Sequence, residues 1–355
     1  MSNKKILITA GGTGGHVFPA LSVANELKKN NTVIWVGAKR GIENQIVPKN
    51  GIQLFSINIS GVRNKGISKI LLLPITLAYA LLQALIIILK HKPNVIIGFG
   101  GYAAIPTCIM GKLCNIPVLI HEQNSVPGMT NRLLAKFVNK VMVAFPDVLI
   151  KNNSILVGNP VRDEIINMPA PDLRYANRTG KLNLLVVGGS LGAKIFNDTM
   201  PLVAAKLDNV NQITHQSGKT EVDAIVSNYK ANGWNNVRVV NFIESIADIY
   251  ATTDLIICRS GALTVSEIQA AGIAAIFIPY PYAVDDHQTT NVKHLVAAGG
   301  ALMLEQKNLT PEILASSINS FDREKCKRMA IIANSLAQKS STQQIVELVN
   351  QAVSN

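Results

Sequence analysis

The chain has 355 residues, of which 48% are hydrophobic and only 16% are charged. This length predicts two domains with separate cores, and the composition excludes an intrinsically disordered chain. The four cysteines form no CxxC pair and do not cluster with the six histidines. We therefore expect reduced thiols in a cytosolic protein and no metal site.

The excess of positive charge lies in the first half of the chain. Residues 1–158 contain 17 Lys and Arg against four Asp and Glu, whereas the remainder contains 17 against 18. This asymmetry indicates an anionic partner for the first half, either an acidic membrane surface or a nucleic acid. The sequence shows no recognition-helix or RNA-binding motif and few aromatic residues for stacking on bases. A nucleic-acid-binding protein is therefore the weaker alternative, and we expect no nucleic acid partner.

A long apolar segment suggests contact with a membrane. Residues 70–89 carry no formal charge, and the segment is long enough to span a bilayer. Because strands before and after it are expected in one sheet, a crossover helix is favoured over a transmembrane span. A wholly buried helix is a second alternative, but the segment is more apolar than one sheet contact requires, which favours a helix docked on a membrane surface. The expected membrane-facing charges are Lys65, Lys69, Lys90 and Lys92.

Strands and helices alternate along the whole chain, as expected for doubly wound parallel sheets. A polar stretch at 163–181 separates two such halves. We predict an N-terminal domain over 1–160 and a C-terminal domain over 161–340, with a helix at 341–355 packing back on the first domain. The strands predicted first are 5–9, 32–36, 95–99, 118–121, 140–143 and 182–187.

Each half opens with a strand followed by a glycine-rich turn, at 11–15 and at 188–192. Such turns let the backbone approach phosphate oxygens, and the following helix start supplies N–H donors. Neither turn matches the dinucleotide fingerprint or the P-loop. Two Rossmann-like domains opening in the same way predict a ligand held in a cleft, at the carboxyl ends of both sheets.

A third strand, 255–258, leads into the turn and helix start at 259–267. Glu267 has two possible roles here. With Thr264 it has the spacing of a capping box, a purely structural role in which Ser260 or Thr264 would cap the helix. Alternatively, the turn binds phosphate and Glu267 accepts hydrogen bonds from both hydroxyls of a ribose.

Six ordered motifs carry a resemblance that spans nearly the whole chain. The motifs lie at 11–20, 121–124, 158–162, 188–192, 259–267 and 286–291. Together they resemble the MurG family of peptidoglycan N-acetylglucosaminyltransferases. The resemblance implies a GT-B fold and a peripheral enzyme at the cytoplasmic face of the bacterial inner membrane. It also implies transfer of GlcNAc from UDP-GlcNAc to the 4-hydroxyl of MurNAc in undecaprenyl-diphospho-MurNAc-pentapeptide (lipid I), which gives lipid II.

The resemblance also implies site residues. In the first domain, Thr13, Gly14, Gly15 and Asn124 would approach the sugar and diphosphate. In the second domain, Arg162 and Ser190 would contact the donor, Ile243 would present backbone groups to uracil, and Gln288 would bind GlcNAc hydroxyls. The diphosphate and ribose would be held by Ala262, Leu263, Thr264, Val265, Ser266 and Glu267.

Inversion at the anomeric carbon requires a base for the acceptor hydroxyl and stabilisation of the departing diphosphate. His16 and Glu122 are the candidate bases, and His16 could instead bind phosphate. The sequence contains no Asp-x-Asp pair, so we expect neither a metal nor another cofactor. The remaining enzyme alternatives are a UDP-GlcNAc 2-epimerase and a GT-B transferase with a soluble acceptor, neither of which needs a basic, apolar acceptor face.

Overall fold

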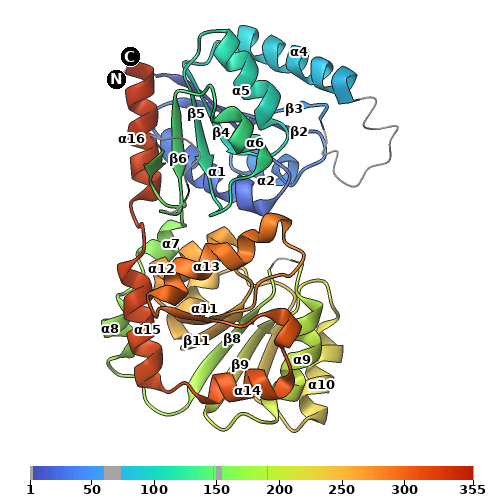
Figure 1. The fold of residues 1–355 in the computed structure, drawn as a ribbon, viewed down its shortest axis with the longest axis vertical. Helices are drawn as coiled ribbons and strands as arrows, with labels where there is room; N and C mark the ends of the chain where they lie inside the picture. Colours follow the sequence, from blue (N-terminus) through green and yellow to red (C-terminus); the bar gives the residue numbers. More distant parts are fainter. Residues whose placement is uncertain (1–2, 60–72, 147, 149–153, 190, 355) are drawn as a thin grey trace. The chain divides into compact units, whose positions relative to one another are not determined.

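The computed structural model describes residues 3–59, 73–146, 148, 154–189 and 191–354. The chain forms two compact units (Figure 1). One comprises Met1–Val161 with Gln338–Asn355, and the other comprises Arg162–Ala337. Each unit contains one sheet whose strand pairs are all parallel and whose faces are covered by helices.

The first sheet has seven strands in the order β3-β2-β1-β4-β5-β6-β7. Its central strands are continuous apolar runs because both faces of a parallel sheet are buried, and Ile6, Leu7 and Ile8 are fully buried. The apolar pattern does not reveal β3 and β7, since β3 is a partly exposed edge strand and β7 has two residues. The strands are β1 Lys5–Ala10, β2 Thr32–Ala38, β3 Gln53–Ile57, β4 Val95–Gly100, β5 Val118–Glu122, β6 Lys140–Val143 and β7 Ile155–Leu156.

The helices of the first unit include one from the far end of the chain, α16. Its residues Ile345, Val349 and Ala352 are buried in the core of this unit with Val17 and Val23 of α1. The helices are α1 Gly14–Leu27, α2 Glu43–Lys49, α4 Leu73–His91, α5 Ala104–Leu113, α6 Met129–Leu134 and α16 Ser341–Ser354.

The second sheet has the strand order β10-β9-β8-β11-β12-β13. Renumbered from its own first strand, this is 3-2-1-4-5-6, the order of the doubly wound dinucleotide-binding fold and of the first six strands of the other sheet. The predicted fold class, two Rossmann-like α/β domains of the GT-B type, is confirmed. The strands are β8 Leu182–Val187, β9 Val210–Gln216, β10 Val237–Val240, β11 Leu255–Cys258, β12 Ala274–Phe277 and β13 Ala301–Met303.

The second unit has a core cluster formed by one face of this sheet, including Leu184 and Ile257, and the helices packed on it. Leu185, Ile256 and Phe277 on the other face are also fully buried. Its α-helices are α7 Asp163–Ile166, α8 Pro171–Tyr175, α9 Lys194–Ala204, α10 Val222–Ala231, α11 Ile246–Thr252, α12 Ala262–Ala271, α13 His287–Ala297, α14 Pro311–Asn319 and α15 Arg323–Ser335. Two short 3-10 turns are η1 Val284–Asp286 and η2 Gln306–Asn308.

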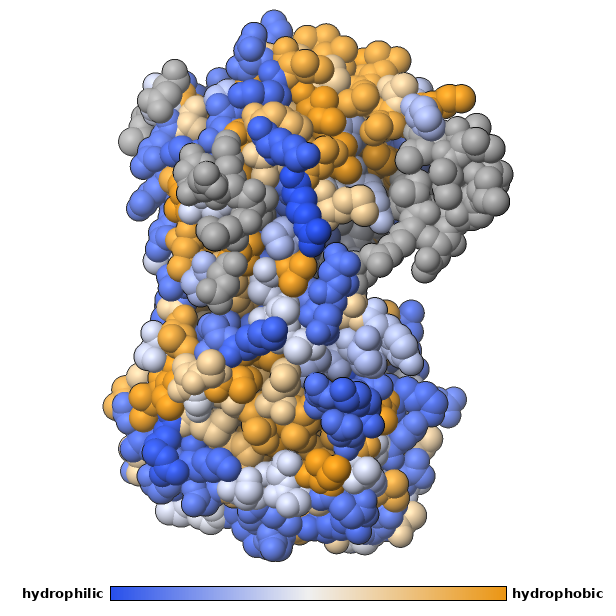
Figure 2. Space-filling view, in the orientation of Figure 1, coloured by the Kyte–Doolittle hydropathy of each residue, from blue (hydrophilic) through white to orange (hydrophobic). Residues whose placement is uncertain are grey.

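Helix α4 covers most of the long apolar segment and ends two residues after it. It is a crossover helix, since it connects β3 to β4 of one parallel sheet. Pro74–His91 is long and apolar enough to span a membrane. Only 17% of this segment is buried inside the protein. The alternative of a wholly buried helix is therefore wrong. Ala80, Ala84 and Ile88 face the protein. Figure 2 shows apolar residues gathered on the surface over α4 and α5. The exposed apolar side chains of α4 are Ile75, Tyr79, Leu82, Ile86 and Leu89.

Candidate functional site

The strand order of each sheet reverses at one point, between β1 and β4 in the first and between β8 and β11 in the second. Open parallel sheets bind ligands at the carboxyl ends of their strands at this point. The predicted turns follow these strands: 11–13 after β1, 188–192 after β8 and 259–261 after β11. The predicted binding segments therefore lie where the fold favours a ligand.

The first glycine turn leads directly into α1. Gly12 has a φ of 90°, which only glycine adopts without strain. Thr13 is the N-cap but makes no side-chain cap bond, and Thr13 and Gly15 are exposed while Gly14 is partly buried. Gly101, in the turn after β4, packs so closely on Gly11 that a side chain there would overlap the Gly11 carbonyl. Gly101 is not among the predicted site residues, although two glycines at the end of a strand are a signal of close backbone approach.

His16 lies in the first turn of α1, partly buried, with Nδ1 3.3 Å from the carbonyl oxygen of Gly11. A carbonyl can only accept, so in this bond Nδ1 carries the proton and Nε2 bears the lone pair. Burial lowers the pKa of His16, and the opposing effects of Glu122, the Gly11 hydrogen bond and Glu43 do not cancel it. The imidazole is therefore neutral at pH 7, with a basic Nε2.

Glu122, the other candidate base, is buried, and both its carboxylate oxygens accept hydrogen bonds. Oε1 accepts from the Asn124 N–H at 2.9 Å, and Oε2 accepts from the Gly128 N–H at 3.0 Å and the Asn131 amide at 2.9 Å. These bonds hold the loop after β5 in shape. They place Asn124 at the start of that loop and use three of the roughly four lone-pair positions of the carboxylate, which makes it a weaker base.

His121 shows how the same loop is attached to the end of the first unit. Its Nε2 lies 2.9 Å from the Gly158 carbonyl oxygen, and its Nδ1 lies 3.1 Å from the amide nitrogen of Gln123. Burial lowers the pKa of His121 to about 4. A neutral ring that donates from Nε2 and accepts at Nδ1 satisfies both contacts, so His121 is a structural connector between two of the motifs.

The start of α12 contradicts the capping-box prediction. The helix begins at Ala262, and its N-cap is Gly261, which makes no side-chain cap bond. Thr264 therefore lies inside the first turn and Glu267 in the second, where a capping box cannot form. The N–H groups of Ala262, Leu263 and Thr264 precede the first intrahelical bond, which runs from the Val265 N–H to the Gly261 carbonyl. This helix start can bind an anion.

Glu267 is instead paired with Arg162. Its Oε1 lies 2.9 Å from Nη2 of Arg162, whose side chain is 42% exposed and also lies 4.0 Å from Glu164. Burial raises the pKa of Glu267, although Arg162 opposes this. The pair places a carboxylate and a guanidinium, the two groups that recognise a diol and a phosphate, beside the start of α12.

Ile243 and Gln288, which are predicted to contact the UDP-GlcNAc donor, already make hydrogen bonds within the second unit. The Ile243 N–H donates to the side-chain oxygen of Gln216 at 3.0 Å, and the Gln288 side-chain oxygen accepts from the Tyr280 N–H at 2.9 Å. Gln216 also donates to the carbonyl of Gly189 in the second glycine turn. The Val265 side chain is fully buried and its N–H donates to the Gly261 carbonyl, and the Ser266 hydroxyl donates to the Ala262 carbonyl, so both residues already have partners within the second unit.

The comparisons with known proteins agree across the whole chain. The model of the glycosyltransferase family 28 N-terminal domain matches residues 6–143, and that of its C-terminal domain matches residues 183–349. The crystal structure of Acinetobacter baumannii MurG has a TM-score of 0.88 and 38% identity, over 98% of this chain and 99% of that one. The chain belongs to the MurG family within glycosyltransferase family 28.

One relative of this family is a protein of Dechloromonas aromatica (strain RCB). It is named UDP-N-acetylglucosamine--N-acetylmuramyl-(pentapeptide) pyrophosphoryl-undecaprenol N-acetylglucosamine transferase. It is 45% identical over 352 residues, which cover 98% of this chain and 99% of that protein. A UDP-N-acetylglucosamine 2-epimerase structure has a TM-score of 0.67 at 15% identity, over 99% of this chain and 97% of that one, and shares the fold alone.

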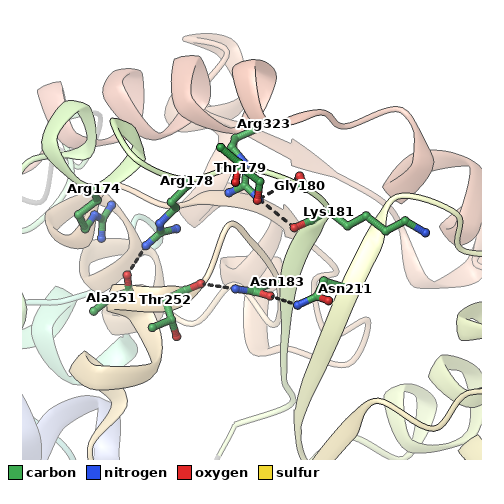
Figure 3. A pocket seen from close by; sticks show the side chains of 10 residues that line it. All are labelled: Arg174, Arg178, Thr179, Gly180, Lys181, Asn183, Asn211, Ala251, Thr252 and Arg323. Atoms are coloured by element: carbon green, nitrogen blue, oxygen red, sulfur yellow. Dashed lines mark hydrogen bonds between the residues drawn. The ribbon is translucent and has the colours of Figure 1, made fainter.

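A cavity of about 520 Å³ lies at the amino ends of strands of the second sheet, beside the starts of β8 and β11 (Figure 3). The predicted turns at 188–192 and 259–261 follow the other, carboxyl ends of these strands. Arg178 and Arg323 line it, and both pair with the buried carboxylate of Asp254, at 2.7 and 2.8 Å. Arg323 also donates to three main-chain carbonyls that precede β8. These arginines tie the amino ends of the strands to α15, and no predicted site residue lines the cavity.

The remaining predicted residues are the four lysines of the membrane face and Ser190 of the donor site. Lys90 and Lys92 are exposed at the end of α4. Lys65, Lys69 and Ser190 lie outside the described residues.

Proposed function

We propose that this chain transfers GlcNAc from UDP-GlcNAc to the 4-hydroxyl of MurNAc in undecaprenyl-diphospho-MurNAc-pentapeptide, forming lipid II in peptidoglycan synthesis. The observation that carries this proposal is the 45% identity, over nearly the full length of both chains, to a relative named for the same transfer. The glycosyltransferase family 28 matches over both units support a transferase rather than an epimerase.

The second unit would bind the donor. The N–H groups at the start of α12 would hold the diphosphate, and Glu267 would accept hydrogen bonds from the ribose hydroxyls. Arg162 lies close enough to Glu267 to turn its guanidinium toward phosphate when the ribose takes the carboxylate. Ile243 and Gln288 would contact uracil and GlcNAc after exchanging their present partners, Gln216 and Tyr280, for the ligand.

The first unit would supply the base. A neutral His16 with its lone pair on Nε2 can accept the proton of the acceptor hydroxyl, whereas binding phosphate would require that nitrogen to donate. The hydrogen bonds to both oxygens of Glu122 support the same choice. We therefore assign the base to His16. Thr13, Gly14, Gly15 and Asn124 would contact the acceptor or the transferred sugar.

We further propose that α4 docks the enzyme on the cytoplasmic face of the inner membrane. The exposed side chains Ile75, Tyr79, Leu82, Ile86 and Leu89 are spaced by alternating steps of four and three residues, so they form one stripe along the helix. Lys90 and Lys92 follow this stripe directly. An apolar stripe with adjoining positive charge is suited to peripheral binding on anionic lipid.

One experiment distinguishes the candidate functions. The purified protein is incubated with UDP-GlcNAc radiolabelled in the sugar, with and without a lipid-linked diphospho-MurNAc acceptor. We expect label in the lipid product only when the acceptor is present. Conversion of the labelled nucleotide sugar without an acceptor would indicate an epimerase, and transfer only to a soluble acceptor would overturn the proposed substrate.

A further inference from the structure

Glu43, the first residue of α2, has a fully buried side chain beside the first glycine turn. Three glycines make room for it: a side chain at Gly11, Gly37 or Gly41 would overlap the Glu43 side chain. Burying a carboxylate is costly unless hydrogen bonds satisfy its oxygens. The burial of Glu43 is therefore tolerated only if both of its carboxylate oxygens accept hydrogen bonds.

Both carboxylate oxygens of Glu43 accept hydrogen bonds from main-chain N–H groups. Oε1 accepts from the Ala38 N–H at 2.9 Å, and Oε2 accepts from the Gly12 N–H at 3.0 Å. The Gly12 N–H and the Gly11 carbonyl belong to one peptide group, and that carbonyl accepts the hydrogen bond from Nδ1 of His16. Carboxylate, peptide group and imidazole therefore form one continuous chain of hydrogen bonds.

We propose that Glu43 is a positioning residue that acts on His16 through the Gly11–Gly12 peptide group. This inference rests on the proposed role of His16 as the base. A negative charge at the N–H end of the peptide group polarises its carbonyl and strengthens the bond from Nδ1, because hydrogen bonds in a chain reinforce one another. The carboxylate fixes the tautomer with a basic Nε2 and stabilises the imidazolium that forms when Nε2 takes a proton, as a carboxylate does directly in a catalytic triad.

Among the described residues, two carboxylates, Glu122 and Glu43, act to raise the pKa of His16 against the effect of burial. The two differ in how they are connected. Glu122 accepts hydrogen bonds from donors of its own loop and the helix that follows, at Asn124, Gly128 and Asn131. Glu43 is the carboxylate that a hydrogen bond joins to the peptide group holding His16.

The test compares the parent protein with Glu43→Gln, which keeps the side-chain length and removes the charge. Its amide oxygen can still accept from the Gly12 N–H, whereas its amide nitrogen cannot accept from the Ala38 N–H. ¹⁵N spectra of histidine-labelled protein report the tautomer and pKa of His16 without turnover. We expect both the Nδ1–H population and the pKa of His16 to fall in the variant. The acidic limb of the kcat profile should move to lower pH and its plateau should fall roughly tenfold, as expected for a weaker base. A merely structural role would lower the rate without moving the limb.

A double-mutant cycle adds a second criterion. In a His16→Ala background, Glu43→Gln should leave the residual rate unchanged within about twofold, because the group on which Glu43 acts is gone. Glu26→Gln removes a carboxylate from the partly exposed surface of α1, where it pairs with Lys29, and should change neither the spectra nor the rate. Urea unfolding of each variant serves as the check on folding, because Glu43, Glu26 and His16 all lie in the first unit.

Identical His16 tautomer and pKa in the parent and in Glu43→Gln would overturn the inference. If that variant does not fold, Glu43→Asp keeps the charge but draws the carboxylate away from the Gly12 N–H, so the Nδ1–H population and the pKa of His16 should again fall; values identical to the parent would count against the inference. Full activity of His16→Ala would instead overturn the proposed base, while the spectra still decide the link between Glu43 and His16.

Discussion

Nη2 of Arg162 lies 2.9 Å from Oε1 of Glu267, a residue 105 positions later in the chain. The pair forms within the second unit, between the residue that opens it and the second turn of α12. The ion pair gives the Glu267 carboxylate a partner. A capping box cannot do so, since Glu267 is too far along α12 to bond the N-cap residue. The pair leads to the first prediction.

Replacing Glu267 by Ala should weaken UDP-GlcNAc binding by about 1–3 kcal/mol, because the ribose hydroxyls lose a charged acceptor. Glu267→Gln should lose less, since an amide oxygen still accepts. Isothermal titration calorimetry with UDP and UDP-GlcNAc measures both. Glu164→Gln is the matched control, because it removes an exposed charge 4.0 Å from the same guanidinium. Parent-like affinity in both Glu267 variants, with intact folding, would remove the ribose contact from the model of the site.

The second prediction concerns the reaction. His16→Ala should lower kcat by roughly 100-fold or more while leaving folding and UDP affinity nearly unchanged. The pH profile of kcat then separates two roles for His16. Loss of the acidic limb in the variant supports the base, whereas an unchanged profile at a lower rate supports a phosphate ligand and directs attention back to Glu122.

The third prediction concerns the apolar stripe of α4. Leu82→Ser combined with Ile86→Ser should weaken binding to anionic vesicles and slow turnover of the long-chain lipid acceptor. Activity on a short-chain soluble acceptor should stay nearly intact, because neither side chain faces the core. Vesicle co-sedimentation measures binding. The control is Leu173→Ser in the second unit, which removes another exposed leucine, 72% exposed. Equal vesicle binding by the double variant and the parent would exclude docking through α4.

The fourth prediction separates the charge from the apolar stripe. Each lysine near an anionic surface contributes about 1 kcal/mol, and this contribution falls off within a Debye length. Replacing Lys65, Lys69, Lys90 and Lys92 by Gln should therefore reduce binding mainly at low salt, leaving an apolar component that persists at high salt. Carbonate washing should release the parent protein from membranes. Retention after washing would favour a transmembrane α4 instead.

The fifth prediction concerns stability in acid. Burial lowers the pKa of His121 to about 4 from an ordinary value of 6.5, so the unfolded chain binds this proton more readily than the folded chain. The contribution of His121 is therefore complete above pH 6.5 and is lost as the pH falls from 6.5 toward 4. One pKa unit corresponds to about 1.4 kcal/mol, which gives a loss of about 3 kcal/mol. Urea unfolding at pH 7 and pH 4.5 measures it, and His121→Gln should show a smaller difference between the two.

Much of the architecture follows from the sequence. The strands predicted first lie within one or two residues of those observed, because a parallel strand buried on both faces is a continuous apolar run. The positions of the glycine turns at 11–15 and 188–192 follow from the ends of those strands. The six motifs in order indicate the family, which the comparisons confirm.

Only the tertiary structure decides which side chains meet. Glu43 and Gly12, which are hydrogen-bonded, are 31 positions apart in the sequence, and Arg162 and Glu267 are 105 positions apart. No local sequence pattern specifies a partner at such separations. A motif likewise does not show that both carboxylate oxygens of Glu122 accept hydrogen bonds from its own loop. The apolar segment predicts a helix, but which side chains of α4 remain exposed depends on the face turned toward the rest of the first unit. Periodicity and turn chemistry are properties of neighbouring residues, whereas the partner of a buried charge and the exposure of a helix face are set by packing between distant segments.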